Sequence, residues 1–385
     1  MSWPTFPLDQ LGTVSRGRSR HRPRDAEHLY GGPFPFVQTG DVKKAPLYLK
    51  EYSQTYSEAG LAQSKLWPVG TLCITIAANI AETAILDIEA CFPDSIIGFI
   101  ADPEKANTKF IKYQFDALLS GQMRTISQGA AQDNLSQAKL LSFEFSAPDL
   151  PTQERIASIL SAYDDLIENN RRRIALLEQA ARLLYREWFV HLRFPGHETA
   201  KFVDGLPEGW ETRKISDVWD ISYGKNLPKT KITNTGLIPV HGADGIIGYY
   251  EGKNVDESLC LVTCRGNGSG NVRRTFGPTF VTNNCFILRP AHKAELIKFH
   301  FAMNVAEFLR LQDMRTGAAQ PQLTLAGISH VLVVVPNDEL LRKYNFQADK
   351  IFAQMDNLRL QNLRLTKARD LLLPRLMDGR IPVKV

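Results

Sequence analysis

The most extended pattern of apolar and polar positions is a run over residues 151–188 in which apolar residues recur alternately four and three positions apart. This spacing is typical of a helix that contributes one seam of a coiled coil. A proline at position 151 suits the first turn of such a helix. The seam positions are Ile156, Leu160, Tyr163, Ile167, Asn170, Ile174, Leu177, Ala181, Leu184 and Trp188.

A second run near the end of the chain repeats this pattern. Its seam positions are Tyr344, Ala348, Ile351, Met355, Leu358, Asn362, Leu365, Arg369, Leu372 and Leu376. If the two helices lie antiparallel with Asn170 opposite Asn362, every other seam residue also faces a seam residue. An unpaired amide in an apolar seam costs about 1–3 kcal/mol, so mutual hydrogen bonding would hold this register. The alternative is that each asparagine faces solvent or another partner. Pro374 is expected to disrupt the last turn.

Shorter periodic segments precede each long helix. In the first half, residues 70–77 and 83–90 favour strands and residues 107–119 favour a helix. In the second half, residues 258–264 and 279–288 favour strands and residues 294–312 favour a helix. Strand-like runs at 140–148 and 330–336 end the two segments. Each half therefore has the order of a mixed α/β module followed by one long helix.

A repeated phrase indicates that the two halves arose by duplication. Residues 128–136 read QGAAQDNLS and residues 316–324 read TGAAQPQLT, a separation of 188 positions. Upstream, Cys73 aligns with Cys260 at a separation of 187, and Gly17 aligns with Gly224 at a separation of 207. Helix-breaking residues at 194–210 separate the halves. We therefore expect modules at 1–150 and 194–335, the second including a linker, with helices at 151–193 and 336–385.

The predicted fold class is α/β (α+β). Two similar mixed modules would be separated by a long antiparallel two-helix coiled coil and related by an approximate two-fold axis. A helix of about 38 residues spans roughly 57 Å at 1.5 Å per residue. Such an object is suited to hold two binding surfaces at a set spacing.

Composition agrees with a globular protein and permits an acidic partner. The chain has 385 residues, 44% of them hydrophobic and 23% charged, with a net charge of +5. No apolar run approaches the ~18 residues that a membrane span needs, and no secretory leader is recognisable. Five cysteines lack zinc-site spacing and are expected to be small core residues in a reducing cytoplasm. A positive balance permits nucleic acid as a partner without requiring it.

Basic residues are concentrated in a few segments that are too highly charged to be buried in a hydrophobic core. Residues 14–25 read VSRGRSRHRPRD, a flexible loop for which phosphate binding is favoured over mere solvation. The equivalent part of the second half carries lysines, followed by arginines around the glycine-rich segment RGNGSGNVRR, which is typical of a hairpin tip. The candidate phosphate-binding residues are Arg16, Arg18, Arg20, Arg22, Arg24, Lys225, Lys229, Lys231, Arg265, Arg273 and Arg274.

The two GAAQ segments are a further candidate, each expected on a loop between a helix and the last strand of its module. Arg124 and Arg315 precede them, and Gln132 and Gln320 close them. Glutamine can hydrogen-bond an adenine edge in the major groove, so these residues are candidates for DNA contacts. The alternative is that a turn of small residues is repeated because it folds the module, with glutamine binding backbone groups.

Motifs for catalysis are missing from the sequence. There is no Asn/Asp-Pro-Pro-aromatic tetrad for methyl transfer, no phosphate-binding loop of the G-x-x-x-x-G-K-[ST] type and no nuclease carboxylate–lysine pattern. The histidines lack metal-ligand spacing. We therefore expect no catalytic residues, no metal and no cofactor in this chain.

Along essentially its full length the chain resembles the specificity subunits of type I restriction–modification systems. The resemblance rests on residues 17–42 (GRSRHRPRDAEHLYGGPFPFVQTGDV), on LPEGW opening the second half, and on the two GAAQ segments. Two helix endings, residues 183–196 and 371–381, add to it. Residues 34–41 match the pattern of the first module in this family, whereas residues 238–245 depart from it. The departure indicates that the halves read different sequences.

This resemblance implies a cytoplasmic, non-catalytic subunit of a restriction enzyme and adenine methyltransferase complex. Two target recognition domains would each read one half of a bipartite sequence in double-stranded DNA. The long helices would set the spacing and dock two methyltransferase subunits that bind S-adenosylmethionine, and restriction subunits would join them. The alternatives are a free-standing DNA-binding regulator and a fused methyltransferase or nuclease, which the missing motifs disfavour.

Overall fold

The computed structural model describes residues 3–77, 81–118, 136–291, 295–317 and 321–384. The chain divides into two compact units, residues 1–171 with 359–385 and residues 172–358. Both units are mixed α/β. Each combines small sheets with parts of two long helices, α6 (Leu150–Tyr185) and α10 (Asp338–Met377). The domain boundaries expected from the sequence remain predictions.

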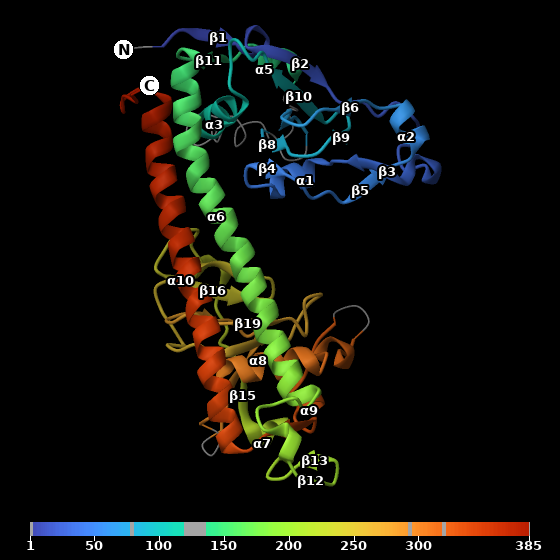
Figure 1. The fold of residues 1–385 in the computed structure, drawn as a ribbon, viewed down its shortest axis with the longest axis vertical. Helices are drawn as coiled ribbons and strands as arrows, with labels where there is room; N and C mark the ends of the chain where they lie inside the picture. The colour runs from blue at the N-terminus through green and yellow to red at the C-terminus, as the bar shows by residue number, and fades with distance from the viewer. Residues whose placement is uncertain (1–2, 78–80, 119–135, 292–294, 318–320, 385) are drawn as a thin grey trace. The chain divides into compact units, whose positions relative to one another are not determined.

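In the described part of unit 1 the strands form three small sheets (Figure 1). The five-stranded sheet has the order β2 (Gly12–Arg16), β10 (Ile96–Ala101), β7 (Leu72–Thr75), β8 (Thr83–Leu86) and β4 (Tyr48–Leu49). The four-stranded sheet has the order β5 (Gln54–Tyr56), β3 (Tyr30–Phe36), β9 (Ala90–Cys91) and β6 (Leu66–Trp67). The two-stranded sheet pairs β1 (Thr5–Pro7) with β11 (Glu144–Ser146). The helices are α1 (Thr39–Lys44), α2 (Glu58–Ala62), α3 (Thr108–Leu118) and α5 (Gln137–Leu141).

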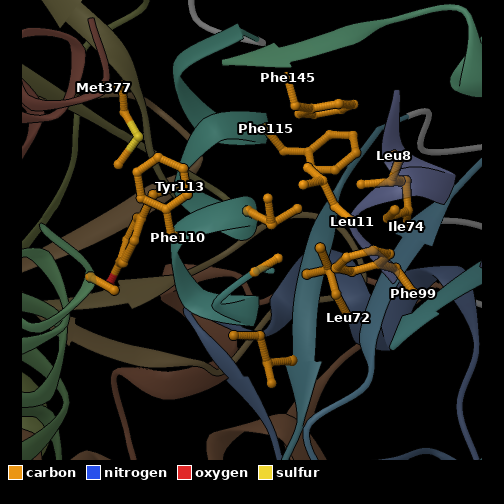
Figure 2. Packing of buried hydrophobic residues seen from close by; sticks show 14 of the residues in the cluster. Leu8, Leu11, Leu72, Ile74, Phe99, Phe110, Tyr113, Phe115, Phe145 and Met377 are labelled. Atoms are coloured by element: carbon orange, nitrogen blue, oxygen red, sulfur yellow. The ribbon is translucent and has the colours of Figure 1, made fainter. Parts of the chain in front are cut away.

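The main core of unit 1 lies between its central sheet, α3 and the long helices. Leu72 and Ile74 of β7 join Phe110 and Phe115 of α3 in this core, which Figure 2 shows. Successive side chains of a strand point to opposite faces, so Cys73 packs into a second core on the other side of the sheet. Alternation along one strand thus supplies two cores.

Unit 2 has a comparable set of elements. Its four-stranded sheet has the order β15 (Trp219–Tyr223), β21 (Cys285–Pro290), β18 (Cys260–Thr263) and β19 (Val272–Arg274). Its three-stranded sheet has the order β17 (Gly245–Tyr250), β16 (Ile238–Gly242) and β20 (Phe280–Val281). The pairs are β14 (Glu211–Lys214) with β22 (Leu332–Val335) and β12 (Phe202–Val203) with β13 (Leu206–Pro207). The helices are α7 (Ile215–Val218), α8 (Phe299–Phe308) and α9 (Leu325–Ile328).

The duplication is visible in the strand order. The run β2–β10–β7–β8 of unit 1 corresponds to β15–β21–β18–β19 of unit 2, antiparallel at every step. In both units a parallel pair, β3–β9 or β16–β20, accompanies this run. Two similar mixed modules were expected from the sequence, and the topology confirms them.

One detail of the sequence alignment was wrong. Gly98 pairs with Cys73 in unit 1, and the corresponding Ile287 pairs with Leu261 in unit 2, so Cys73 corresponds to Leu261 rather than to Cys260. A shift of one residue moves a side chain to the other face of a sheet. Accordingly, Cys260 packs toward the helix-facing core of its unit, whereas Cys73 packs away from it. Aligning Cys73 with Cys260 by residue type therefore placed the two strands one residue out of register.

In unit 1, α6 and α10 lie side by side and run in opposite directions (Figure 1). Asn170 Nδ2 donates to Asn362 Oδ1 at 2.9 Å, which is the pairing that the seam pattern predicts. Asn362 in turn donates to the backbone carbonyl of Ile167 at 3.3 Å. Pro374 was expected to disrupt the last turn of this helix. Instead, α10 continues past it to Met377. Ile156 and Leu376 consequently share the main core.

In unit 2, the other halves of the two helices keep the same register. Ile174, Leu177 and Ala181 form one cluster with Ile351 and Met355. Trp188, in a π-helical turn that extends α6 (Arg186–Val190), lies edge-on to Tyr344 with ring centroids 6.1 Å apart. The residue numbers of Asn170 with Asn362 and of Trp188 with Tyr344 have the same sum, as one antiparallel register requires.

All five cysteines are buried and free of disulfides, as the sequence indicated. In the described part of the chain, no helix is both long enough and apolar enough to cross a membrane.

Candidate nucleic-acid interface

The arginine-rich loop of unit 1 follows β2 and has a defined backbone. Gln63 Oε1 accepts hydrogen bonds from the backbone N–H groups of Arg20 at 2.5 Å and His21 at 3.0 Å. Ser64 Oγ donates to the carbonyl of Arg18 at 2.8 Å. Both residues follow directly on α2, so this short helix determines the path of the loop. The sequence predicted a flexible loop, but glutamine and serine side chains hold it in place.

The five arginines at the end of β2 and in this loop are all exposed, but they differ in their partners. Arg24 forms an ion pair with Asp94 at 2.9 Å. Arg22 Nη1 donates to the carbonyls of Ser19 and His21, both at 2.8 Å, so its guanidinium folds back onto the loop. Among the described residues, the side chains of Arg16, Arg18 and Arg20 make no hydrogen bond or ion pair. These three are the best placed to contact an external anion.

A lysine adds to this positive charge. Burial lowers the pKa of Lys65, and the nearby charge of Arg18 lowers it further. Lys65 Nζ stands 3.6 Å from the centroid of the Trp67 ring. Cations gathered on one surface attract phosphate groups. Lys65 could not be recognised from the sequence, because it lies 47 positions after Arg18, outside the basic segment.

A glycine at the end of the first core strand fixes the start of this loop. A Cβ on Gly17 would lie 2.3 Å from the carbonyl oxygens of Phe92 and Pro93, and one on Gly224 would lie 2.3 Å from that of Thr282. Neither position can accept a side chain without moving backbone. The residues just before them, Arg16 and Tyr223, therefore occupy corresponding and well-defined positions in the two units.

In unit 2 the flanks of the second GAAQ segment are attached to the hairpin between β18 and β19. Arg265 and Thr316 each bridge to Gln322, and Gly266 donates its N–H to the carbonyl of Pro321 at 3.0 Å. Ser269 Oγ also donates to Pro321 at 3.0 Å. The glycine-rich segment is thus a hairpin tip, as predicted, and it holds this part of the chain in place.

Three cations lie at this attachment or at the end of β15 beside it. Arg315 is exposed and donates to the carbonyls of Gln312 at 2.6 Å and Asn267 at 3.4 Å. The Arg265 guanidinium lies over the Tyr223 ring, 5.9 Å from its centroid. Lys225 follows Tyr223 and is exposed, with its backbone bonded to Val281 and Asn283. The end of β15, the hairpin tip and the flanks of the GAAQ segment therefore form one basic rim.

The remaining candidates of unit 2 lie elsewhere or are occupied. Lys229 and Lys231 are exposed on a 3-10 turn (Lys229–Lys231) that leads to the β17 side of the module. Arg273 is half-buried and donates to the carbonyl of Ala243 at 2.7 Å. Its charge, after the larger effect of burial, contributes to lowering the pKa of His241 to about 4. Arg273 Nη1 also approaches Thr263 Oγ1, at the base of the hairpin, at 3.5 Å. Among the described residues, no hydrogen bond or ion pair joins the Lys229 or Lys231 side chain to the rim.

Arg274 requires a correction, because it is not available to DNA. Its side chain is only 4% exposed and forms an ion pair with Asp356 of α10. The guanidinium also lies 4.0 Å from the ring centroid of Phe276 and 4.9 Å from that of Phe352. Consecutive arginines of a strand point to opposite faces, and Arg274 points inward. Its role is to join β19 to α10.

Three sequence candidates, Arg124, Gln132 and Gln320, lie outside the described residues. The first GAAQ segment lies outside them entirely. Within the described chain, no cluster of three or more His, Cys, Asp or Glu side chains could hold a metal ion.

Comparison with known proteins identifies the family. A profile described as "Type I restriction modification DNA specificity domain" matches residues 2–179 and again residues 207–369. The chain belongs to this family. The double match follows the duplication, with one specificity domain in each half. Family membership assigns DNA sequence recognition to the chain, and the basic surfaces at corresponding strand ends agree with that role.

Curated members of the specificity family match over nearly their whole length. The MjaIX specificity subunit of Methanocaldococcus jannaschii is 23% identical, covering 99% of this chain and 94% of the relative. The HindI specificity subunit of Haemophilus influenzae is 23% identical, covering 96% and 98%. Among solved structures, the S subunit from M. genitalium covers 100% of this chain and 97% of its own, with a TM-score of 0.59 and 17% identity. That structure supports the fold.

Proposed function

We propose that this specificity chain reads a bipartite DNA target, with one half-site read by each unit. The observation that carries this proposal is the paired arrangement of the basic surfaces. Each unit places exposed cations at the end of its first core strand, beyond a glycine that cannot accept a side chain. Phosphate contacts fix the position of a protein on DNA, and side chains at base edges read the sequence.

The surrounding side chains support different sequences for the two half-sites. The corresponding positions before the glycines carry Arg16 in unit 1 and Tyr223 with Arg265 in unit 2. The segments 34–41 and 238–245 also differ, with buried Phe36 in one and buried His241 in the other. Duplicated backbones with different side chains are expected to bind different bases.

We also propose that α6 and α10 set the gap between the half-sites and dock two methyltransferase subunits. Away from the seam these helices carry exposed large apolar side chains, which are Leu166, Leu176, Leu183, Phe346, Leu360, Leu363 and Leu371. Isolated exposed leucines are ordinary, but several on two paired helices fit a surface that partner helices cover. The methyltransferase subunits would supply S-adenosylmethionine binding and adenine methylation, and restriction subunits would complete the complex.

Copurification combined with methylation mapping tests this proposal. The tagged full chain is expressed with the methyltransferase encoded beside it, and the modified genomic sites are read by sequencing. The expected result is a complex with about two methyltransferase subunits and one modified motif consisting of two half-sites and a fixed gap. A chain that binds DNA without any partner would instead support a free-standing regulator. Methylation by the purified chain alone would support an enzyme.

A further inference from the structure

The ring of Tyr223 is held on one side by the core of unit 2. It is 39% exposed, at the end of β15, and lies 4.8 Å from the fully buried ring of Phe286, centroid to centroid. Its backbone is paired with Phe286 in the ladder between β15 and β21. The next residue, Gly224, cannot be replaced by a residue with a side chain, because a Cβ there would lie 2.3 Å from the carbonyl oxygen of Thr282 and 2.4 Å from that of Val281. The exposed ring is therefore a rigid platform.

Arg265 is held above this platform at both its backbone and its side chain. Its backbone bridges to Gln322, and its neighbours Cys264 and Gly266 are bonded to Leu323 and Pro321. The guanidinium lies over the Tyr223 ring at 5.9 Å, within the range of a cation–π contact. No acidic side chain among the described residues forms an ion pair with Arg265. The N–H groups of the Arg265 guanidinium can therefore donate to an external acceptor.

We infer that Tyr223 is a positioning residue that orients Arg265 to read a guanine in the half-site of unit 2. This inference rests on the proposed function. A guanidinium whose plane is held by an aromatic ring can present two parallel N–H groups to guanine O6 and N7 in the major groove. A phosphate contact tolerates many orientations of a cation and does not require such a platform. An arginine whose backbone is fixed and whose guanidinium lies beside a fixed ring therefore favours base readout over backbone binding.

The corresponding position of unit 1 supports this reading. Arg16 occupies the strand position of Tyr223, before the equivalent glycine, and is itself exposed. In unit 1 a guanidinium extends directly from the strand end, whereas in unit 2 an aromatic ring at that position carries a guanidinium from the neighbouring hairpin. Both units thus place an arginine at the end of the first core strand, in unit 1 from the strand itself and in unit 2 from the neighbouring hairpin.

The test uses methylation mapping with the full chain and its methyltransferase, with variants Tyr223→Ala, Tyr223→Phe, Arg265→Lys and Arg265→Ala. Lys253→Ala is the control, since Lys253 is an exposed cation of the same unit that is paired with Asp256 and lies on neither long helix. Tyr223→Ala and Arg265→Lys are expected to lower discrimination for guanine roughly tenfold at one position of one half-site. Phenylalanine should retain discrimination, because its ring keeps the platform. The other half-site and the melting temperature should not change.

Two outcomes would overturn the inference alone. The first is an unchanged motif for Tyr223→Ala. The second is an equal loss of binding to all sequences for Arg265→Ala, with a salt slope reduced by about one, which identifies a phosphate contact. Wild-type cells that show no bipartite motif would overturn the proposed function and this inference with it. The wild-type measurement therefore separates the two failures.

Discussion

The side-chain amides of Asn170 and Asn362 form a hydrogen bond of 2.9 Å between α6 and α10. Asn170 is buried, and its Nδ2 also approaches Gln361 Oε1 at 3.5 Å. A polar pair within an apolar seam disfavours any register that would leave either amide unpaired. The relationship between these two residues therefore fixes how the helices of unit 1 align.

Replacing one member of this pair should cost more than replacing both. Asn170→Leu leaves the Asn362 amide without its partner in the seam, so we expect a loss of about 1–3 kcal/mol in the free energy of unfolding. The double variant Asn170→Leu/Asn362→Leu should recover most of that loss, because no amide remains unpaired. Urea unfolding measures both. Equal losses for the single and double variants would contradict the pairing.

Arg369 should stabilise unit 1 through Asp164. The two side chains form an ion pair, and Asp164 Oδ2 also accepts from the Tyr113 hydroxyl at 2.5 Å. Burial raises the pKa of Tyr113, and the charge of Asp164 raises it further. The Tyr113 hydroxyl therefore stays protonated and remains a hydrogen-bond donor. Arg369→Ala leaves a buried carboxylate with one neutral partner, and we expect a loss of about 3 kcal/mol. The exposed pair Arg342–Asp338 provides a control, for which about 0–1 kcal/mol is expected.

Stability of unit 2 should fall in mild acid because of His300. This side chain is fully buried, and burial lowers its pKa from 6.5 to about 4 despite the nearby Asp349 carboxylate. The unfolded chain takes up the proton at higher pH, so the stabilisation is complete above pH 6.5. It decreases as the pH falls from 6.5 to about 4, by roughly 3 kcal/mol at most. Urea midpoints measured across this window should fall less for His300→Phe. An equal fall would show that His300 does not carry the effect.

Arg18 and Arg20 should contribute to DNA affinity without regard to sequence. The double alanine variant is expected to weaken binding to specific and random duplexes alike and to lower the salt slope by about one for each phosphate that is no longer neutralised. Arg24→Ala is the matched control, because Arg24 is already paired with Asp94. Titrations at several salt concentrations measure the slope. Loss of affinity for one target sequence only would make these arginines base readers.

Lengthening both helices should change the gap between half-sites. Seven residues inserted after Arg171 and seven after Leu360 preserve the seam, because a heptad is two turns of a coiled coil. The insertion adds about 10 Å, so the preferred gap should grow by roughly three base pairs. Four residues inserted in α6 alone would shift the seam and should destabilise the chain instead. An unchanged gap after the double insertion would contradict a spacing role.

The helix register and the duplicated modules could be predicted from the sequence, because both rest on repeated patterns. The placement of single side chains could not, because it depends on contacts in the folded chain. The seam placed Asn170 against Asn362, and the duplication predicted two similar modules. Pro374 was misjudged because the apolar pattern continues beyond it, and Leu376 and Met377 pack into the core of unit 1. Arg274 was misjudged because a basic residue beside a glycine-rich tip looks exposed until the face of its strand is known. Tyr223 and Lys65 were missed because their partners are distant in sequence.

The composition of unit 1 has a consequence for its synthesis. Its core needs Leu373, Leu376 and Met377, which emerge from the ribosome only after all of residues 172–358. Unit 2 is contiguous in sequence and can fold first. The strands of unit 1 are synthesised earlier, but their core is complete only after the end of α10 has been synthesised. A nascent chain halted before residue 359 should therefore hold a protease-resistant second half and an open first half.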